Sequence, residues 1–293
     1  MIKILVDSAS DLTAQDKIYD YFMPIAVNID GKEYLDSVDL NADTFYKLLL
    51  KTEQFPHTSQ PSPQSFVEIF EKVLADGDEL IYFAIASELS GTYQGATLAK
   101  NMVDYDKIHI IDTKTVTHAI GVLAGYAQKL IKERYSAKEI VEKCEELKGK
   151  IKIYAGVDTL EYLFRGGRLS RTSAAVGKIA DIKPVVTITA DGKVSSIGKC
   201  LGKARAMKFI VDKVLSYELD ESFPICSLFT YSEENCLELE DKLSQKKFKH
   251  RKASSGRLHY WNPCRPRSLR CTFCDQMILN HPPKIWVGDL FFC

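Results

Sequence analysis

The chain has 293 residues, of which 45% are hydrophobic and 27% charged, the balance of an ordinary globular protein. Lys and Arg together number 39, as do Asp and Glu, so no net charge attracts the chain to nucleic acid or an anionic membrane. No run approaches the roughly 20 apolar residues of a membrane-spanning helix. Because Met1–Asp7 enters a buried-strand pattern at once, we expect no signal peptide and a cytoplasmic protein.

Short apolar runs rich in β-branched residues alternate with longer segments of helical periodicity, which is typical of βαβ units around a largely parallel sheet. In the first half the predicted strands are Ile2–Val6, Met23–Ile29, Glu79–Ile85 and Lys107–Ile111. The predicted helices are Ala42–Leu50, Pro63–Ala75, Thr92–Met102, Thr117–Glu133 and Ala137–Leu147. A boundary follows at Lys148–Lys150, so residues 1–148 are expected to form an N-terminal α/β domain.

The second half repeats the alternation and is expected to form a second α/β domain over residues 149–249, again with a largely parallel sheet. Its predicted elements are the strand Ile153–Val157, the apolar segment Ala174–Ile182, the helix Ala204–Tyr217, the strand Ile225–Tyr231 and the helix Glu233–Ser244. Between them, Asp191-Gly192 separates Val185–Ile188 from Val194–Ile197, which predicts a β-hairpin.

Polar side chains follow the first predicted strand, in the segment Asp7–Asp11. Ligands of open α/β sheets bind at the carboxyl ends of strands, so Ser8 is a candidate for lining a pocket. The same residues are explained at least as well by a turn in which Ser10 or Asp11 caps the next helix. Both interpretations stay open at this segment.

The segment His57–Pro63, here called the Thr58 loop, holds two prolines that stiffen it and fix its hydroxyl groups at low entropic cost. Ser62 followed by Pro63 is explained by the start of a helix, with Ser62 as the N-cap. That explanation leaves the side chains of Thr58 and Ser59 without a purpose. Thr58 is therefore predicted to be functional.

The segment Ser87–Tyr93, here called the Ser90 loop, joins a predicted strand to a predicted helix. Ser90 and Gly91 at a helix start would aim a hydroxyl and backbone N–H groups at an anion, where the helix dipole also favours negative charge. The loop lacks the lysine of a Walker A motif, so the pattern indicates a carboxylate or phosphate site of another kind. An ordinary N-cap is the alternative.

Taken in order, these segments resemble the DegV family of fatty-acid-binding proteins. The resemblance rests on Asp7-Ser8 with Asp11, Thr58–Ser62, Leu89–Tyr93 and Leu160–Leu163 leading to Arg165–Ser170. Each motif is weak alone, but all of them in the family's order at compatible spacing are specific. The resemblance runs from residue 1 to about residue 249.

The resemblance implies a long-chain fatty acid held non-covalently between the two domains, with its carboxylate on Thr58 and Ser90. The supporting pocket would comprise Ser8, Ser59, Gly91, Thr92 and Arg165. It also implies that a separate fatty acid kinase converts the presented acid to an acyl phosphate. Uncharged hydroxyl donors suit a carboxylate whose tail lies in an apolar tunnel, because a buried lysine would need charge compensation. Neither a cofactor nor a metal is expected.

An enzyme is the alternative to this carrier, for instance an acyl- or phosphoryl-transfer catalyst that uses the Ser90 loop. Its one candidate base is Glu88, and residues this close in sequence rarely aim their side chains together. His109 and His118 are isolated histidines of the structural kind. We therefore expect a lipid-binding carrier without catalytic residues of its own.

From His250 the sequence changes character and shows no clear strand or helix period. Cysteines and histidines crowd this stretch in a pattern that imitates a zinc site: His259, Cys264, Cys271, Cys274, His281 and Cys293. The family resemblance instead calls here for a strand and a loop of the type Gly-Thr-His-Val-Gly-Pro-Gly, and neither is present. The apparent zinc site is therefore not predicted to be genuine.

The genetic code offers an explanation for this tail. The codons of His259–Cys264, regrouped one base later, permit Thr, Ile, Gly, Thr, His and Val, and the following codons permit the rest of the missing loop. We hypothesise that a one-base frameshift near Lys249 or His250 replaced the native C-terminus by an aberrant tail over residues 250–293. The loss of the final strand would leave an unpaired sheet edge in the second domain.

Overall fold

The computed structural model describes residues 1–14, 16–170, 181–220, 223, 226–228, 234–247 and 290–292. Their contacts divide them into two compact units. The first unit holds Met1–Gly149 and Thr189–Lys193, and the second holds the other described residues. The predicted domains 1–148 and 149–249 stay a prediction. Contacts alone define the two units, whereas a domain must also be able to fold independently.

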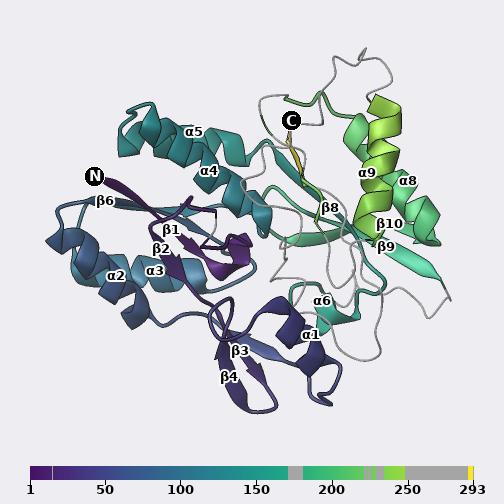
Figure 1. The fold of residues 1–293 in the computed structure, drawn as a ribbon, viewed down its shortest axis with the longest axis horizontal. Helices are drawn as coiled ribbons and strands as arrows, with labels where there is room; N and C mark the ends of the chain where they lie inside the picture. Colours follow the sequence, from purple (N-terminus) through teal and green to yellow (C-terminus); the bar gives the residue numbers. More distant parts are fainter. Residues whose placement is uncertain are drawn as a thin grey trace. The chain divides into compact units, whose positions relative to one another are not determined.

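The first unit is built on a parallel sheet with the strand order β2-β1-β6-β7 (Figure 1). Its strands are β1 (Ile2–Asp7), β2 (Tyr21–Met23), β6 (Glu79–Ala84) and β7 (Ile108–Asp112). The central strands are near-continuous apolar runs, as expected where helices cover both faces of a parallel sheet. The predicted parallel sheet is confirmed here, and the carboxyl ends of its strands meet at one edge.

Helices cover both faces of this sheet (Figure 1). One face carries α2 (Pro63–Ala75) and α3 (Thr92–Val103), and the other carries α4 (His118–Lys132) and α5 (Ala137–Lys148). The start of α2 is as predicted, with Ser62 accepting a hydrogen bond from the Ser65 N–H at 3.1 Å and Pro63 at the first helical position.

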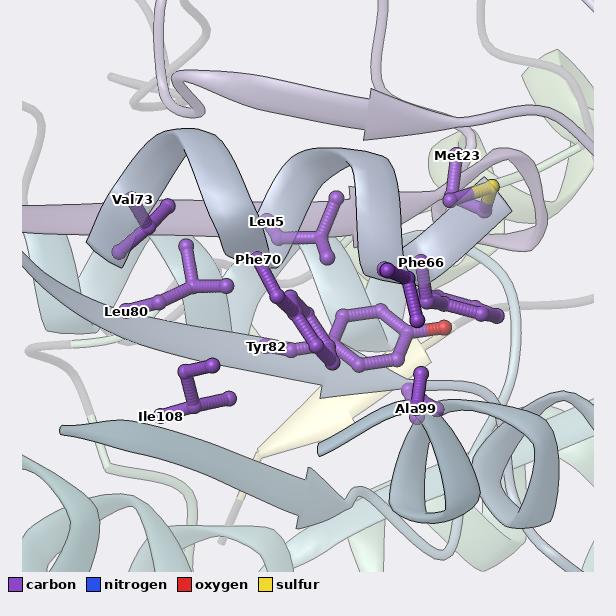
Figure 2. Close-up of a cluster of buried hydrophobic side chains, with 12 residues drawn as sticks. Leu5, Met23, Phe66, Phe70, Val73, Leu80, Tyr82, Ala99 and Ile108 are labelled. Carbon is purple, nitrogen blue, oxygen red and sulfur yellow. The ribbon is translucent and has the colours of Figure 1, made fainter. Parts of the chain in front are cut away.

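The core beneath α2 and α3 is an aromatic and aliphatic cluster (Figure 2). Phe66 and Phe70 of α2 pack on Tyr82 of β6, with the Phe66 and Tyr82 ring centroids 5.5 Å apart. All three are fully buried, and burial of each such side chain contributes about 2–3 kcal/mol. Tyr82 is amphipathic, so its hydroxyl needs a polar partner at the edge of this core.

A small antiparallel sheet of order β4-β3-β5 also belongs to the first unit. It comprises β3 (Ala26–Ile29), β4 (Lys32–Leu35) and β5 (His57–Ser59), and α1 (Ala42–Leu49) lies between β4 and β5 in the chain. The single strand predicted over Met23–Ile29 is therefore wrong. The strand is interrupted at Pro24, which has no N–H to donate to a neighbouring strand, so β2 and β3 join different sheets.

The second unit contains an antiparallel sheet of order β10-β9-β8-β11. Its strands are β8 (Ile151–Gly156), β9 (Ile182–Ile188), β10 (Val194–Leu201) and β11 (Leu290–Phe292). The expectation of a largely parallel sheet is wrong for this unit. The predicted hairpin around Asp191-Gly192 is confirmed, and so short a connection permits only antiparallel neighbours.

Three helices of the second unit are described: α6 (Glu161–Arg165), α8 (Lys203–Leu215) and α9 (Glu234–Lys247). Buried side chains of α8 and α9 pack with β8 and β9: Tyr154, Val185, Met207, Ile210 and Leu239. The strand β11, from the last residues of the chain, pairs with β8. The predicted loss of a native final strand stays a prediction. Most of Ala174–Ile182 and of Ile225–Tyr231, and the tail apart from β11, lie outside the described residues.

Candidate functional site

The carboxyl ends of β1 and β6 are joined by the side chain of Asp7. Its Oδ2 accepts hydrogen bonds from the Tyr82 hydroxyl and the Ile85 N–H, both at 2.9 Å, and its Oδ1 accepts one from the Ala9 N–H at 3.1 Å. The residue is fully buried, and this burial raises the pKa of Asp7 to about 6 although the three hydrogen bonds favour the charged form. Asp7 therefore holds two strand ends together.

The turn after β1 is closed by its own hydrogen bonds. Asp7 caps the short 3-10 turn Ser8–Ser10, and the Ser10 hydroxyl donates to the Asp7 carbonyl at 2.7 Å. The predicted turn is confirmed, with Asp7 as the cap in place of Ser10 or Asp11. The buried Ser8 hydroxyl oxygen accepts from the Ile25 N–H at 3.1 Å, which gives this side chain a structural partner. Its place in a ligand pocket stays a prediction.

Ser90 lies immediately before α3, where the Ser90 loop turns into the helix. Its N–H donates to the Ala86 carbonyl at 3.2 Å, and its hydroxyl lies 2.8 Å from the hydroxyl of the buried Thr92. Gly91 is the N-cap of α3 and supplies no side-chain acceptor to the first N–H groups of the helix. The half-buried Ser90 hydroxyl therefore lies at the positive end of the helix dipole.

Gln60 brings the Thr58 loop against the Ser90 loop. A Cβ built on Gly91 would lie 1.6 Å from Oε1 and 2.7 Å from Cδ of Gln60, so the Gln60 carboxamide fills the space that a side chain at 91 would need. One turn along α3, a Cβ on Gly95 would lie 3.5 Å from the Pro61 carbonyl oxygen. The two segments predicted to bind one carboxylate thus lie side by side at the start of α3.

Thr58 lies in a strand, where the sequence analysis predicts only a stiff loop. It pairs with Val27 of β3 and is half-buried, whereas the next residue, Ser59, is exposed. Successive side chains of a strand point to opposite faces, so the Thr58 and Ser59 side chains lie on opposite faces of the small sheet, and the place of each in a ligand pocket stays a prediction. Any support that Ser59 gives to a ligand on the Thr58 side would come from its backbone.

A second carboxylate, Asp112, links the end of β7 to the Ser90 loop, and the sequence analysis missed it. Its Oδ1 accepts from the Ser87 N–H at 3.1 Å, and its Oδ2 lies 2.6 Å from the Lys114 ammonium, which also donates to the Ser87 hydroxyl at 3.1 Å. Burial opposes ionisation of Asp112, but hydrogen bonds from Lys114 and Ser87 outweigh it and lower its pKa. The available signal was a polar residue directly after the predicted strand Lys107–Ile111.

Arg165 is the last residue of α6 in the second unit. Its Nη1 lies 3.9 Å from the Glu161 carboxylate one turn earlier, and about a third of its side chain is exposed. Arg168 nearby donates to the Gly166 carbonyl, and burial lowers its pKa. The place of Arg165 in a ligand pocket stays a prediction.

The enzyme interpretation gains no support from the surroundings of Ser90. Glu88, its candidate base, is paired with the Lys193 ammonium at 3.6 Å, while the Ser90 hydroxyl is engaged with Thr92. Within the described ranges, no group of three or more His, Cys, Asp or Glu side chains is arranged to hold a metal, and the cysteines of the tail lie outside those ranges. No helix among the described residues is long and apolar enough to cross a bilayer.

Comparison with known proteins gives a consistent result along most of the chain. A family model described as "Uncharacterised protein, DegV family" matches residues 1–259. A DegV domain-containing protein of Caldanaerobacter subterraneus is 39% identical over 221 residues, which cover 75% of this chain and 78% of that protein. The family match thus continues for a short way past the position of the hypothesised frameshift.

Two solved structures share the fold. A fatty-acid (stearic acid) binding protein from Eubacterium ventriosum is 25% identical, with a TM-score of 0.82 over 100% of this chain and 98% of that chain. A DegV family protein from Thermus thermophilus, described by its fatty acid binding, also has a TM-score of 0.82, over 100% of this chain and 99% of that chain. Its identity is 23%, so this second likeness supports the fold alone. The predicted α/β architecture is confirmed.

Proposed function

The chain belongs to the DegV family, and we propose that it binds one long-chain fatty acid non-covalently, with the carboxylate on the hydroxyls of Thr58 and Ser90. The observation that carries the proposal is the contact of Gln60 with Gly91, which places the Thr58 loop against the Ser90 loop. The similar structure of a stearic acid-binding protein supports the choice of ligand.

The chemistry of the two loops suits a carboxylate. A hydroxyl that already exchanges a hydrogen bond with Thr92 is held in place, so Ser90 would lose little freedom on accepting a ligand. The N-terminal N–H groups of α3 add a positive partial charge without a titratable cation. Hydrogen bonds to an ionised group are worth about 1.5–3 kcal/mol, which is enough to fix the head of an otherwise apolar molecule.

Mass spectrometry of one purified sample under native and under denaturing conditions tests this proposal. The native mass should exceed the denatured mass by one fatty acid, because a non-covalent ligand survives only the first condition. Extraction with organic solvent should release the same acid in equimolar amount. Equal masses, in a sample that also fails to bind added stearic acid, would contradict the proposal.

The bound acid would serve as the substrate of a separate, cytoplasmic fatty acid kinase. In that reaction a carboxylate oxygen attacks the γ-phosphorus of ATP, ADP leaves, and an acyl phosphate forms, so this chain acts as carrier and performs no catalysis. The proposal is supported by the family resemblance and by the half-buried positions of Thr58 and Ser90, where a carboxylate would remain within reach of a partner enzyme. Incubation of the loaded protein with ATP should yield acyl phosphate only when a purified bacterial fatty acid kinase is added.

A further inference from the structure

The Ser90 loop is contacted by a segment from far along the chain, the turn Thr189–Lys193, here called the 189–193 turn. This turn connects β9 with β10 and groups with the first unit. The buried Gly192 lies at its tip with φ +91°, and a Cβ built there would lie 3.2 Å from the Ala86 Cβ and 3.3 Å from the Lys114 Cα. The turn therefore packs on Ala86, whose carbonyl accepts the Ser90 N–H.

The 189–193 turn is closed by bonds among its own residues. The Gly192 N–H donates to the Thr189 carbonyl at 2.8 Å, and the Lys193 N–H donates to the Thr189 hydroxyl oxygen at 3.1 Å. Asp191 accepts a hydrogen bond from Thr189 and pairs with the Lys193 ammonium at 2.9 Å, and these partners lower the pKa of Asp191 to about 2. A turn with this many internal bonds presents a fixed surface to the Ser90 loop.

Charge adds a second connection to the same loop. The Lys193 ammonium lies 3.6 Å from the Glu88 carboxylate, two residues before Ser90. On the other side of Gly192, Lys114 bonds both Asp112 and the Ser87 hydroxyl. The turn thus packs on Ala86 through Gly192 and forms an ion pair with Glu88 through Lys193. Lys114, which Gly192 also contacts, donates a hydrogen bond to Ser87.

We propose that the 189–193 turn is a positioning element for the fatty-acid carboxylate, with Gly192 and Lys193 holding the Ser90 loop in the conformation that binds it. The inference rests on the proposed function and extends it to residues that touch no ligand. Without the turn's contacts, the loop would sample more conformations, and the ligand would bear the entropic cost of ordering it. The expected result is weaker binding with faster dissociation.

Gly192→Ala tests the packing contact, and Gly31→Ala is its matched control. Both glycines have a left-handed backbone (φ +91° and +78°), but the Cβ of Gly31 would meet nothing within 4 Å. The strain of a side chain at positive φ is therefore common to both variants. Affinity for cis-parinaric acid, a naturally fluorescent long-chain fatty acid, should fall roughly 2- to 30-fold in Gly192→Ala only.

A double-mutant cycle of Lys193→Met and Glu88→Gln tests the ion pair. Glu88→Gln should weaken binding about threefold to fivefold, the range for an exposed pair. Lys193→Met should weaken it at least as much, because it also removes the pair with Asp191, and the double variant should bind no more weakly than Lys193→Met. Lys193→Arg should keep the wild-type affinity. Lys129→Met removes a pair of similar exposure and length, with Glu133 at 3.9 Å, and should leave the affinity unchanged.

The outcomes separate the two proposals. Wild-type protein that fails to bind cis-parinaric acid would overturn the proposed function and this inference with it. Wild-type binding together with equal affinities for Gly192→Ala and Gly31→Ala, and no effect of Lys193→Met, would overturn the positioning role alone. Thermal unfolding of each variant measures its loss of stability. The inference requires that Gly192→Ala lose more affinity than Gly31→Ala when the two variants are destabilised equally.

Discussion

Two carboxylates close neighbouring junctions at the carboxyl edge of the parallel sheet, and their environments differ sharply. Asp7 joins β1 to β6 through neutral donors and is fully buried, so its pKa is raised to about 6. Asp112 joins β7 to the Ser90 loop, bonds an ammonium group and is partly exposed, so its pKa is lowered. We therefore expect Asp7 to contribute mainly to the stability of the fold. Asp112 instead fixes the Ser90 loop, to which we assign ligand binding.

Removal of each carboxylate should show this difference most strongly. Asp7→Ala leaves the Tyr82 hydroxyl and the N–H groups of Ile85 and Ala9 buried without acceptors, which should lower the free energy of unfolding by about 3 kcal/mol. Asp112→Ala should lower it by about 1 kcal/mol, because water can reach its former partners. Urea unfolding measures both values, and equal losses would contradict the comparison.

The pH dependence of stability should carry the signature of Asp7. Its pKa is about 6 in the folded protein against 3.8 ordinarily, so between these values the folded state holds a proton that the unfolded state has released. This group's contribution to stability therefore falls as the pH rises from about 4 to about 6, by about 3 kcal/mol in all. Asp7→Asn should lack that slope.

Urea unfolding of wild type and Asp7→Asn at several pH values in this window provides the measurement. The lost charge and the altered hydrogen bond add an offset that does not vary with pH, so only the difference in slope is informative. Parallel stability curves for the two proteins would show that Asp7 does not titrate in this window.

Tyr82→Phe should have a smaller effect on the same junction. It removes one of the two donors to Asp7 Oδ2 and keeps the ring that packs on Phe66, so the unfolding free energy should fall by about 1–2 kcal/mol. The lost bond favoured the charged carboxylate, so the pKa of Asp7 should rise further and the pH-dependent decline should extend to higher pH. A carbon-13 NMR titration of the Asp7 carboxyl would detect the shift or its absence.

Lys114→Met should affect stability least. The ammonium is about one-third exposed, and exposed ion pairs contribute about 0.2–1 kcal/mol. A lowered pKa means that Asp112 stabilises the fold above the unfolded-state pKa and loses that contribution as the pH falls through its folded value. The variant should therefore lose less stability than wild type on acidification below about pH 4, and an unchanged acid response would contradict the ion pair's role.

Local signals made much of the first unit predictable. The start of α2 follows from Ser62-Pro63, and all its long helices are predicted to within a residue or two of the observed ends because caps and apolar periodicity agree. The hairpin of β3 and β4 was also readable, since Asp30-Gly31, with both φ positive, is the typical residue pair for such a turn. The prediction of one strand over Met23–Ile29 leaves this hairpin out, because it does not end the strand at Pro24.

Other features depend on contacts that sequence spacing does not encode. Gln60 meets Gly91 only after β5 has paired with β3, and nothing local to either residue predicts that contact. In the second unit, the predicted hairpin already required β9 and β10 to be antiparallel. The antiparallel pairing of β8 with β9 joins segments farther apart in the chain, and no local signal predicts it. The frameshift stays a hypothesis, which resequencing of the gene around codon 250 would test.

The most direct test of the central claim is the affinity of hydroxyl-deleted variants for stearic acid. Thr58→Val and Ser90→Ala should each bind at least about tenfold more weakly than wild type, because each loses a hydrogen bond to an ionised carboxylate. Thr97→Val and Ser65→Ala, which remove half-buried hydroxyls bonded within α3 and at the start of α2, should bind as wild type does. Wild-type affinity in both Thr58→Val and Ser90→Ala would place the carboxylate elsewhere and contradict the account.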